Sequence, residues 1–392
     1  MLRVLTLSTL FPNAAQPTFG VFVERQTLGL AARDDVELEV VAARRLPVWP
    51  LVLHPRYRDK AGLPERETWK GVTVHRPRFR GWPLIGGSGM ARAQAHALLP
   101  LLRKLRERFA FDVIDAEFFW PDGPAAMHLA SALGVPFSIK ARGSDIDCWS
   151  HMPAVARQIL AAGLAADGLL AVSDVLKSHM VELGLPADKI RVHHTGVEER
   201  FRPVDRAAAK ASFGVEGPVI AFVGHLIELK GPLLALAALE DIPGATLIMI
   251  GEGAQRRQLE RVALEKGLGD RLRLLGTRPH EELPGLLAMA DVMVLPSQRE
   301  GLANAWVEAV ACGTPVVTTD VGGARDVIDR PAAGRIVARR PEAIAAAVRE
   351  ILADPPDPLE VRKAAEKFSW QRNADELFTH LAGLAARAPA GR

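Results

Sequence analysis

The sequence predicts an α/β protein with two domains, each built around a parallel β-sheet wound by crossover helices. The chain has 392 residues, which is more than a single domain usually holds. Short β-branched runs alternate with longer helical patterns through both halves, as is typical of parallel sheets. Between the halves, Thr195–Arg206 is polar, contains Gly196 and Pro203, and shows neither the hydrophobic period of a strand nor that of a helix. We therefore expect the interdomain hinge in this segment.

The expected strands are short apolar runs that lie between the helical segments. In the first half they are Leu2–Ser8, Val36–Val41, Val72–Arg76, Asp112–Asp115, Pro136–Lys140 and Gly168–Val172. In the second half they are Val219–Val223, Thr246–Ile250, Arg271–Leu274, Val292–Leu295 and Pro315–Thr318. Two separate Rossmann-like sheets follow from this order. Trp49–Gly89, rich in Pro, Gly, Trp and Arg, interrupts the alternation and should form a long surface insertion, and the chain after Pro355 is helical.

Composition and charge exclude several classes of protein. Hydrophobic residues make up 48% and charged residues 24% of the chain, which are ordinary globular values and exclude disorder. No uncharged apolar run reaches the roughly 20 residues of a membrane-spanning helix, so any membrane contact should be peripheral. The net charge of +3 is too small for a histone-like binder of nucleic acid. Cys148 and Cys312 are isolated, which indicates neither a disulfide framework nor a zinc site and favours the reducing cytosol.

The positive charge is concentrated in one part of the chain. Between Arg44 and Arg108 there are 15 Lys and Arg residues and 4 Asp and Glu residues, a net +11, which leaves −8 for the remainder. A basic region of this size favours an anionic partner, either phosphate groups or an anionic membrane face. A solvated basic face is the alternative interpretation.

Leu295–Asp320 reads as a strand, a short polar loop, a helix, a glycine turn and a second strand. Gly301 permits a close approach of the backbone to a ligand. The amide groups after it, those of Leu302, Ala303 and Asn304, would lie at a helix N-terminus. Because the helix dipole and unpaired N–H groups favour anions there, this segment predicts a phosphate-binding site.

Two carboxylates, Glu300 and Glu308, belong to the same segment and lie eight residues apart. Along a helix this spacing spans roughly 12 Å. That is longer than the roughly 5 Å between the carboxyl groups of a retaining glycosidase. It suits a ligand with hydroxyl-rich ends around a diphosphate, with one carboxylate accepting hydrogen bonds from each end. The alternatives are a helix-cap partner for Glu300 and a solvated helix position for Glu308.

A second strand-to-helix loop, Gly224–Gly231, also carries cations. Lys230 precedes an apolar helix and is suited to act as a point charge on phosphate, and a protonated His225 would add a donor. The alternative for Lys230 is an ordinary surface lysine. Gly251-Glu252-Gly253 follows the next strand, but position 256 is Arg, so the dinucleotide-binding fingerprint fails.

In the first half, loops after expected strands also carry polar groups. Phe11–Val23 connects the first strand to a helix that starts near Gly20, and either lines a ligand cleft or is a simple connector. Arg142 and Asp145, in an Arg-Gly-Ser-Asp segment, are candidates for binding phosphate and an acceptor hydroxyl, with Asp147 and Trp149 as weaker candidates. His128 lies on the helix after Trp120-Pro121-Asp122-Gly123, where a structural histidine is the commoner outcome.

Several short motifs occur together in this chain. In the second half they are Gly224–Gly231, Gly251–Gly253, Leu275–Thr277, Ala290-Asp291, Pro296-Ser297, Glu300–Leu302 and Glu308–Pro315. In the first half they are Phe19–Glu24, Pro121–Gly123, Arg142–Ile146 and Thr195–Val197. This set closely resembles the retaining, metal-independent glycosyltransferases of family 4, which have the GT-B fold of two facing Rossmann lobes. The resemblance covers nearly the whole chain and is to bacterial members of the exopolysaccharide and teichuronic-acid type.

The resemblance implies how the chain is divided. Residues 1–200 would form an acceptor-binding domain and residues 201–369 a domain that binds the nucleotide-sugar donor, with residues 370–392 packing back on the first. Catalytic residues would be Glu300, Lys230, His225 and Arg142. Donor-binding residues would be Gly224, Gly251, Gly253, Thr277, Gly301, Leu302, Ala303, Asn304 and Glu308. Residues on the acceptor side would be Phe19, Gly20, Asp122, His128 and Asp145.

In such a family member Glu308 binds the donor ribose, Glu300 the transferred sugar, and the amides after Gly301 the diphosphate. Lys230 and His225 would balance the leaving phosphate. This sequence departs from the family pattern at two positions, with His225 where Arg is usual and Arg142 where His is commoner, although some members carry Arg-Gly-Ser-Asp here. His225 would bind phosphate more weakly than the usual Arg, and its contribution would depend on protonation of the imidazole.

The implied reaction moves a sugar from a nucleoside-diphosphate sugar to a glycan or lipid-diphosphate-linked acceptor in cell-surface polysaccharide synthesis, with retention of configuration. No metal ion, other cofactor or nucleic acid would be required. We expect a cytoplasmic enzyme whose basic half docks on the inner face of the plasma membrane, through Arg103, Lys104, Arg106 and Arg108 beside Leu101, Leu102 and Leu105. Two alternatives stay open: a nucleotide-sugar epimerase, and a catalytically inactive donor-binding subunit.

Overall fold

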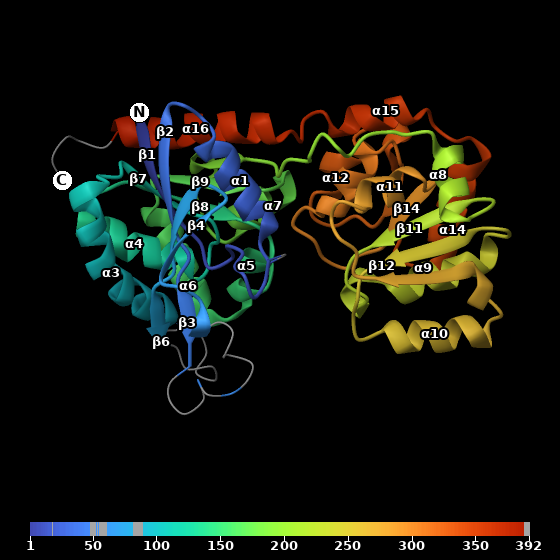
Figure 1. Cartoon of the computed structure of the whole chain (residues 1–392), viewed down its shortest axis with the longest axis horizontal. Helices are drawn as coiled ribbons and strands as arrows, with labels where there is room; N and C mark the ends of the chain where they lie inside the picture. The colour runs from blue at the N-terminus through green and yellow to red at the C-terminus, as the bar shows by residue number, and fades with distance from the viewer. Residues whose placement is uncertain (18, 48–51, 53, 55–60, 81–88, 388–392) are drawn as a thin grey trace. The chain divides into compact units, whose positions relative to one another are not determined.

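The computed structural model describes residues 1–17, 19–47, 52, 54, 61–80 and 89–387. It divides into two compact units (Figure 1). The N-terminal unit consists of Met1–Gly196 together with Trp370–Arg392, and the C-terminal unit of Val197–Ser369. Both have helices on the faces of a largely parallel sheet, so the predicted α/β class with two Rossmann-like domains is confirmed.

The sheet of the N-terminal unit has eight strands in the order β10-β9-β8-β7-β1-β2-β5-β4. Their bounds are β1 Leu2–Leu7, β2 Val36–Val41, β4 Arg66–Trp69, β5 Val72–His75, β7 Val113–Ala116, β8 Phe137–Ala141, β9 Gly168–Ala171 and β10 Ile190–Val192. All neighbours are parallel except β4 and β5, which are antiparallel. Two further strands, β3 (Arg44–Leu46) and β6 (Arg78–Arg80), pair with each other. The expected insertion Trp49–Gly89 falls partly outside the described residues and includes β4, β5 and β6.

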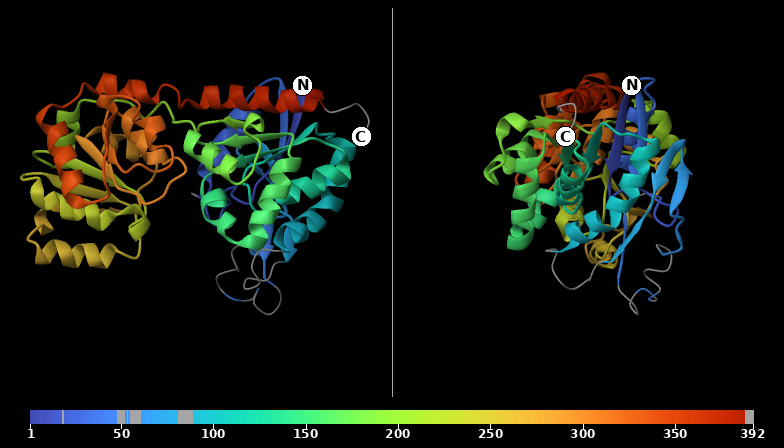
Figure 2. Two further views of the ribbon diagram at one scale, coloured as in Figure 1. Left: turned by 180° about the vertical axis from the view of Figure 1, so that it is seen from behind. Right: turned by 90° about the vertical axis from the view of Figure 1, so that its left-hand side faces the viewer.

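The helices of this unit are α1 Val21–Ala31, α3 Met90–Arg108, α4 Asp122–Leu133, α5 Ser144–Asp147, α6 Pro153–Ala165, α7 Asp174–Glu182 and α16 Trp370–Arg387. The last helix of the chain, α16, packs against α1 near the start of the chain (Figure 2). Leu377 and Leu381 of α16 are buried in one cluster with Val23 and Leu30 of α1. The C-terminal helix is therefore part of the N-terminal core.

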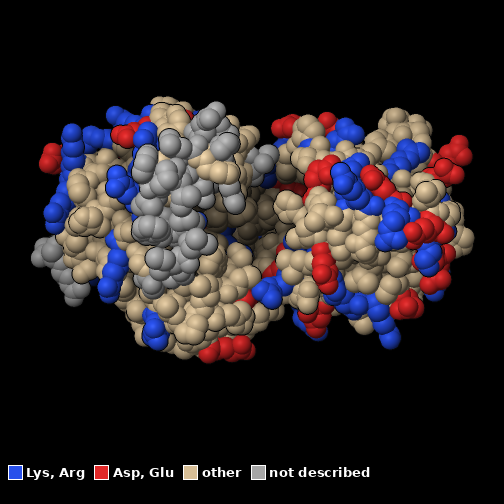
Figure 3. Space-filling view, turned by 90° about the horizontal axis from the view of Figure 1, so that it is seen from below, with Lys and Arg blue, Asp and Glu red and all other residues tan. Residues whose placement is uncertain are grey.

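Helix α3 presents a basic face and buries its apolar one. Leu102 and Leu105 are 0% and 3% exposed, so the expectation that they contact lipid is wrong. They are buried because α3 packs against α4. Arg103 and Lys104 are exposed. In Figure 3, Lys and Arg side chains are spread along the N-terminal unit with few acidic side chains between them.

The C-terminal unit has a six-stranded, fully parallel sheet in the order β13-β12-β11-β14-β15-β16. The strands are β11 Val219–Val223, β12 Thr246–Ile250, β13 Leu272–Gly276, β14 Val292–Leu295, β15 Val316–Thr318 and β16 Gly334–Ile336. The helices are α8 Arg206–Phe213, α9 Pro232–Ala238, α10 Arg256–Glu265, α11 Leu283–Ala288, α12 Asn304–Ala311, α13 Ala324–Val327, α14 Pro341–Ala353 and α15 Pro358–Arg362. Trp306 of α12 is 0% exposed in the core, which anchors that helix to the sheet.

Each sheet has one point where the strand order reverses. In the N-terminal unit the chain runs outward from β1 to β2 and β5 on one side and from β7 to β10 on the other. In the C-terminal unit it runs from β11 to β13 on one side and from β14 to β16 on the other. Open α/β sheets bind ligands outside the carboxyl ends of the strands at such a switch point. The fold therefore predicts ligand-binding sites at the loops after β1 and β7 and at those after β11 and β14.

Candidate active site

The loops after β11 and β14 form one packed unit at the switch point of the C-terminal sheet. The amide of Gln298 donates to the carbonyl of Leu229 over 2.7 Å. Arg339 joins the loops from the side, donating to the carbonyls of Pro296 at 3.0 Å and Glu228 at 2.7 Å. Gly231 has φ +71°, and a Cβ there would lie 2.7 Å from the carbonyl oxygen of Pro296. The two loops thus hold each other in a fixed position.

This packing brings together two residues that the sequence predicted to be catalytic. Lys230 of the first loop forms an ion pair with Glu300 of the second, and their side chains are 20% and 10% exposed. Ser297 Oγ donates to the same oxygen of Glu300, Oε1, over 2.7 Å. The alternative for Glu300, a partner in capping the helix, is wrong because Lys230 and Ser297 hold its carboxylate, and among the described residues no amide of α12 donates to it. In this pair the carboxylate of Glu300 is oriented to accept hydrogen bonds from hydroxyl groups, and Lys230 is a cation suited to bind phosphate.

Helix α12 begins at Asn304, directly after the second loop. Its first amide groups have no partners within the helix, and the helix dipole adds partial positive charge at this end. The backbone before it is held by the loop after β15, because the amide of Gly323 donates to the carbonyl of Gly301 over 2.7 Å. Glu300 lies in the loop, so its expected separation from Glu308 along a helix is wrong, and only Glu308 lies on α12.

Glu308 is buried, with 8% of its surface exposed, so the alternative of a solvated helix position is also wrong. Its Oε1 is 3.0 Å from Nε2 of His280, in the loop after β13. Arg200 donates to Nδ1 of the same ring over 2.6 Å, which leaves the proton of a neutral imidazole on Nε2. The edge of that ring packs against Phe201, with 5.1 Å between ring centroids. Neither His280 nor Arg200 carried a signal in the sequence.

The predicted glycines let neighbouring loops approach closely. A Cβ on Gly251, which has φ +139°, would lie 2.0 Å from the carbonyl oxygen of Gly224, and one on Gly253 would lie 2.3 Å from that of Leu226. These contacts explain Gly251 and Gly253 by backbone packing, whereas a Cβ on Gly224 would come no closer than 3.6 Å to another residue's atoms. His225 and Thr277 are exposed at the ends of β11 and β13.

The switch point of the N-terminal sheet also carries a cavity, with a volume of about 530 Å³. Its walls come from the loops after β1, β2 and β7, together with β3, β6 and the start of α3. The lining residues are Thr9, Leu10, Phe11, Asn13, Gln16, Phe19, Ala42, Ala43, Arg44, Arg45, Leu63, Arg76, Phe79, Met90, Phe118, Trp120, Pro121 and Trp149. Of the predicted acceptor-side residues, Phe19 lines this cavity. Gly20 supports it, because a Cβ there would overlap the carbonyl of Leu10.

The two predicted acceptor-side carboxylates are fully buried and tie loops together. Asp122 accepts hydrogen bonds from the amide of Thr9 at 2.8 Å, its hydroxyl at 3.1 Å and the amide of Gln94 at 2.9 Å. Burial raises the pKa of Asp122 to about 7. Asp145 accepts from the backbone amides of Phe119, Arg142 and Gly143, and burial raises its pKa as well. Both side chains are therefore occupied by the protein itself.

Arg142 follows β8 and His128 lies on α4, as expected, but the Arg142 side chain is held by a buried partner. The Arg142 side chain is 5% exposed, is paired with Glu117, and lies over the ring of Phe22 at 4.8 Å. Burial opposes ionisation of Glu117, but Arg142 and then Lys140 hold the pKa of Glu117 below its ordinary value. The expected phosphate contact of Arg142 thus has no support in the geometry. His128 is half-buried on α4, where burial and then the charge of Arg92 lower its pKa.

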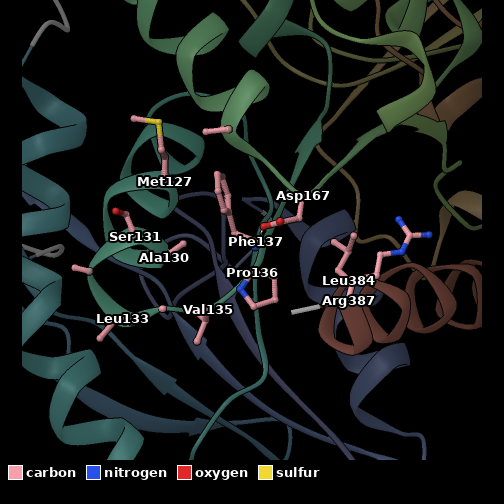
Figure 4. Close-up of a pocket in the computed structure, with 13 residues that line it drawn as sticks. Met127, Ala130, Ser131, Leu133, Val135, Pro136, Phe137, Asp167, Leu384 and Arg387 are labelled. Atoms are coloured by element: carbon pink, nitrogen blue, oxygen red, sulfur yellow. Dashed lines mark hydrogen bonds between the residues drawn. The ribbon is translucent and has the colours of Figure 1, made fainter. Parts of the chain in front are cut away.

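A second cavity of about 810 Å³ lies at the opposite end of the N-terminal sheet, where β8 begins (Figure 4). It lies between α4, the start of β8 and the end of α16, with Met127, Phe137 and Leu384 among its lining residues. Because it adjoins the amino ends of the strands, the switch-point rule does not make it a candidate site.

Within the described residues, no group of three or more His, Cys, Asp and Glu side chains is arranged to hold a metal ion. A search of the same residues for a helix long and apolar enough to cross a membrane also finds none.

Comparison with known proteins decides the family. Residues 204–368 match the family model described as glycosyl transferases group 1, and residues 24–201 match the model described as glycosyltransferase family 4. The chain is 30% identical over 335 residues to 2-deoxystreptamine glucosyltransferase of Streptomyces kanamyceticus, covering 79% of this chain and 84% of the relative. The chain is a glycosyltransferase.

A further relative and two solved structures agree with this assignment. The glycosyltransferase is 28% identical over 334 residues to the putative teichuronic acid biosynthesis glycosyltransferase TuaC of Bacillus subtilis, covering 82% of each. Its fold matches that of sucrose-phosphate synthase from Thermosynechococcus elongatus, with a TM-score of 0.78, 21% identity, and coverage of 98% of this chain and 100% of the other. It also matches Anabaena HepE in complex with UDP, with a TM-score of 0.73, 17% identity and the same coverage. The glycosyltransferase thus has the GT-B fold and uses a nucleotide-sugar donor.

Proposed function

We propose that this glycosyltransferase is a retaining, metal-independent enzyme that transfers a sugar to a glycan or lipid-diphosphate-linked acceptor in cell-surface polysaccharide synthesis. The observation that carries the proposal is the Lys230–Glu300 pair, oriented by Ser297 at the switch point of the C-terminal sheet and followed at once by the N-terminus of α12. A carboxylate that accepts hydrogen bonds from sugar hydroxyls, a cation and the amides of a helix N-terminus together suit a sugar linked to a diphosphate.

In the proposed complex the diphosphate lies against Lys230 and the first amides of α12, where the helix dipole also stabilises its charge. Glu300 accepts hydrogen bonds from hydroxyls of the transferred sugar, and Glu308 from the ribose. The bond between the anomeric carbon and the phosphate oxygen breaks while the acceptor oxygen attacks the same face. The leaving phosphate takes the acceptor's proton. Lys230, His225 and α12 stabilise the developing negative charge, so the reaction needs no metal ion.

The cavity at the N-terminal switch point is the proposed acceptor site. It lies where an open parallel sheet binds ligands, and its volume of about 530 Å³ is within the range of small-molecule sites. The relative TuaC, described as acting in teichuronic acid biosynthesis, favours a polymeric or lipid-linked acceptor. A small soluble acceptor is the second candidate, because another relative is a 2-deoxystreptamine glucosyltransferase.

The exposed basic face of α3 supports docking on an anionic membrane, from which a lipid-linked acceptor would be reached. With Leu102 and Leu105 buried, the contact is electrostatic, through Arg103 and Lys104. We expect this docking to weaken steeply with added salt. Flotation with neutral and with anionic vesicles measures it, and equal binding to both contradicts it.

The two alternatives predict different products. An epimerase converts the donor in the absence of an acceptor, whereas an inactive subunit binds the donor without turnover. The test is product analysis with a panel of UDP- and GDP-sugars, with and without a membrane extract as acceptor source. The wild type is compared with Glu308→Ala and with a control, Glu265→Ala, which removes an exposed carboxylate at the end of α10.

We expect nucleoside diphosphate release that depends on acceptor, is abolished by Glu308→Ala and is unchanged by the control. The anomeric configuration of the product, determined by NMR, tests retention, and full activity after removal of divalent ions with a chelator tests metal independence. Interconversion of the donor without acceptor identifies an epimerase instead, and binding with no turnover identifies the inactive subunit.

A further inference from the structure

We propose that the cavity of the N-terminal unit binds an acceptor sugar that carries a phosphate or diphosphate on its ring, with the phosphate at Arg45 and the ring at Trp120 and Trp149. This inference rests on the proposed function, which places the acceptor in this cavity, and it names the chemical class of that acceptor.

The described part of the cavity wall carries positive charge. Among the described lining residues there are three arginines, Arg44, Arg45 and Arg76, and no Asp or Glu. Arg76 is bound to Glu67 and to the carbonyl of Pro12, and Arg44 donates to the carbonyls of Arg76 and Leu63. Both are buried and hold the wall together.

Arg45 is the lining arginine whose guanidinium is available. It is exposed on β3, and within the described part of the chain its hydrogen bond goes to the sulfur of Met90, at 3.1 Å, a weak acceptor. An arginine that has no carboxylate or carbonyl partner there is suited to bind phosphate through two parallel N–H groups. The cavity therefore offers an anion site at one wall.

Two indole rings supply a second feature. Trp120 and Trp149 lie with their ring centroids 4.5 Å apart at an angle of 36°, and both line the cavity. Flat aromatic surfaces pack against the C–H faces of sugar rings. Trp120 is 3% exposed, yet among the described residues its Nε1 has no hydrogen-bond partner. Because Trp120 is so deeply buried, the sugar ring would pack mainly against the half-buried indole of Trp149.

The two features together define the ligand more narrowly than either alone. A neutral glycan would leave Arg45 unused, and inorganic phosphate would leave the aromatic wall unused. A cavity of about 530 Å³ has room for a monosaccharide with its phosphate. This chemistry occurs both in soluble sugar phosphates and in sugars linked to a lipid through a diphosphate.

The test is calorimetric binding to the full chain without donor, using matched pairs of ligands. The pairs are the 1-phosphate and the methyl glycoside of glucose, galactose, mannose and N-acetylglucosamine, with inorganic phosphate as a separate probe. Each is measured with wild type, Arg45→Gln, Arg45→Lys and a control, Arg157→Gln, which removes an exposed charge on α6. Thermal unfolding of each variant checks that it is folded.

We expect at least one 1-phosphate to bind about tenfold or more tightly than its methyl glycoside and than phosphate alone. Arg45→Gln should remove that advantage, Arg45→Lys should keep part of it, and Arg157→Gln should leave it unchanged. The inference is overturned if no pair shows a preference for the phosphate, or if Arg45→Gln leaves the preference intact. Because Arg45 is in the N-terminal unit, its effect also separates this cavity from phosphate binding at Lys230.

Transfer assays then distinguish a soluble acceptor from a lipid-linked one. They also separate a failure of this inference from a failure of the proposed glycosyl transfer. Release of nucleoside diphosphate is measured with a soluble sugar phosphate and with a lipid-diphosphate sugar in detergent micelles, and use of either supports the inference. Transfer to neutral glycosides alone, unaffected by Arg45→Gln, overturns the inference while the proposed glycosyl transfer stands. If the sugar phosphate binds in an Arg45-dependent way but no sugar is transferred, the inference about the cavity stands and the proposed glycosyl transfer is contradicted.

Discussion

At the scale of single residues, Asp122 shows how a buried charge couples stability to pH. Burial raises its pKa to about 7, whereas its value in the unfolded chain is near 3.8. The unfolded state therefore holds fewer protons between these values, and stability falls as pH rises from about 4 to 7. Asp122→Asn removes this titration. Its Nδ2 would take the place of Oδ1, so the side-chain amide of Gln94 would rotate to accept through Oε1, which has no partner among the described residues. The oxygen of the new side chain would accept from Thr9.

We expect Asp122→Asn to stabilise the N-terminal unit by about 1–3 kcal/mol at pH 8, with the gain shrinking toward zero near pH 4. The measurement is urea denaturation of both proteins at several pH values. A difference in unfolding free energy that is the same at pH 5 and pH 8 would show that the carboxylate is not the cause.

His280 provides a second prediction at this scale, because it orients Glu308. In His280→Gln the side-chain amide nitrogen can take the place of Nε2 and still donate to Glu308, whereas in His280→Asn the side chain is too short to reach it. We expect His280→Asn to raise the donor KM about tenfold with a smaller change in kcat, because one charge-assisted bond that orients the ribose ligand is lost.

His280→Gln should retain most of the donor affinity. Steady-state kinetics with the donor identified in the panel measure both variants. If the two variants lose donor affinity equally, the ring acts through its packing against Phe201 and not through the hydrogen bond.

The residue scale also shows which parts of the site the sequence reveals. Lys230 and Glu300 follow neighbouring strands of one sheet, so a motif read along the chain places both at the same switch point. His280 and Arg200 contact their partners across 28 and 80 residues, and only the folded chain joins them. Arg142 and Asp145 were expected to face a ligand because they follow a strand, but buried partners occupy them.

At the scale of elements, the contact between the loops after β11 and β14 yields a prediction with a matched control. Gly231 and Gly214 both have left-handed backbones, with φ +71° and +65°. A Cβ on Gly231 would lie 2.7 Å from the Pro296 oxygen, whereas one on Gly214 would meet no atom within 4 Å. Gly214→Ala should therefore cost about 1–2 kcal/mol of stability from backbone strain alone.

Gly231→Ala should cost more, because the loop must also move away from Pro296, and it should lower kcat/KM by separating Lys230 from Glu300. Thermal unfolding and donor kinetics of the two variants check this. Equal losses of stability with unchanged kinetics in Gly231→Ala would show that the loop contact does not position the pair.

The strands differ in how well the sequence reveals them. All eleven expected strands are present, because interior strands of parallel sheets are continuous buried runs such as Val292–Leu295. The strands that were not expected are β3, β4, β6, β10 and β16. Each lies at the edge of a sheet or in the two-stranded pair, and each has only three or four residues. An edge strand buries fewer side chains, so it leaves a weaker apolar pattern.

At the scale of the whole molecule, the two units have separate cores. The C-terminal unit is one continuous stretch of the chain, whereas the N-terminal unit consists of two stretches. The large cluster of the C-terminal unit is built from residues 197–368 alone. The N-terminal core needs Leu377 and Leu381 of α16, from the far end of the chain. We therefore expect residues 197–369, expressed alone, to unfold cooperatively and to bind the nucleoside diphosphate of the donor, as calorimetry would measure.

Residues 1–196 expressed alone should be poorly folded, because the face of α1 that α16 covers would be exposed. Burying Leu377 and Leu381 contributes about 1.5–3 kcal/mol each, which is a large share of the stability of one domain. The backbone of Trp370 lies against Gly196, where a Cβ would be 2.7 Å from the Trp370 nitrogen, so a short Gly-Ser linker can join residue 196 to residue 370. Circular dichroism should show this joined chain folded with a cooperative thermal transition. If residues 1–196 alone are as stable as the joined chain, α16 is not part of the N-terminal core in solution.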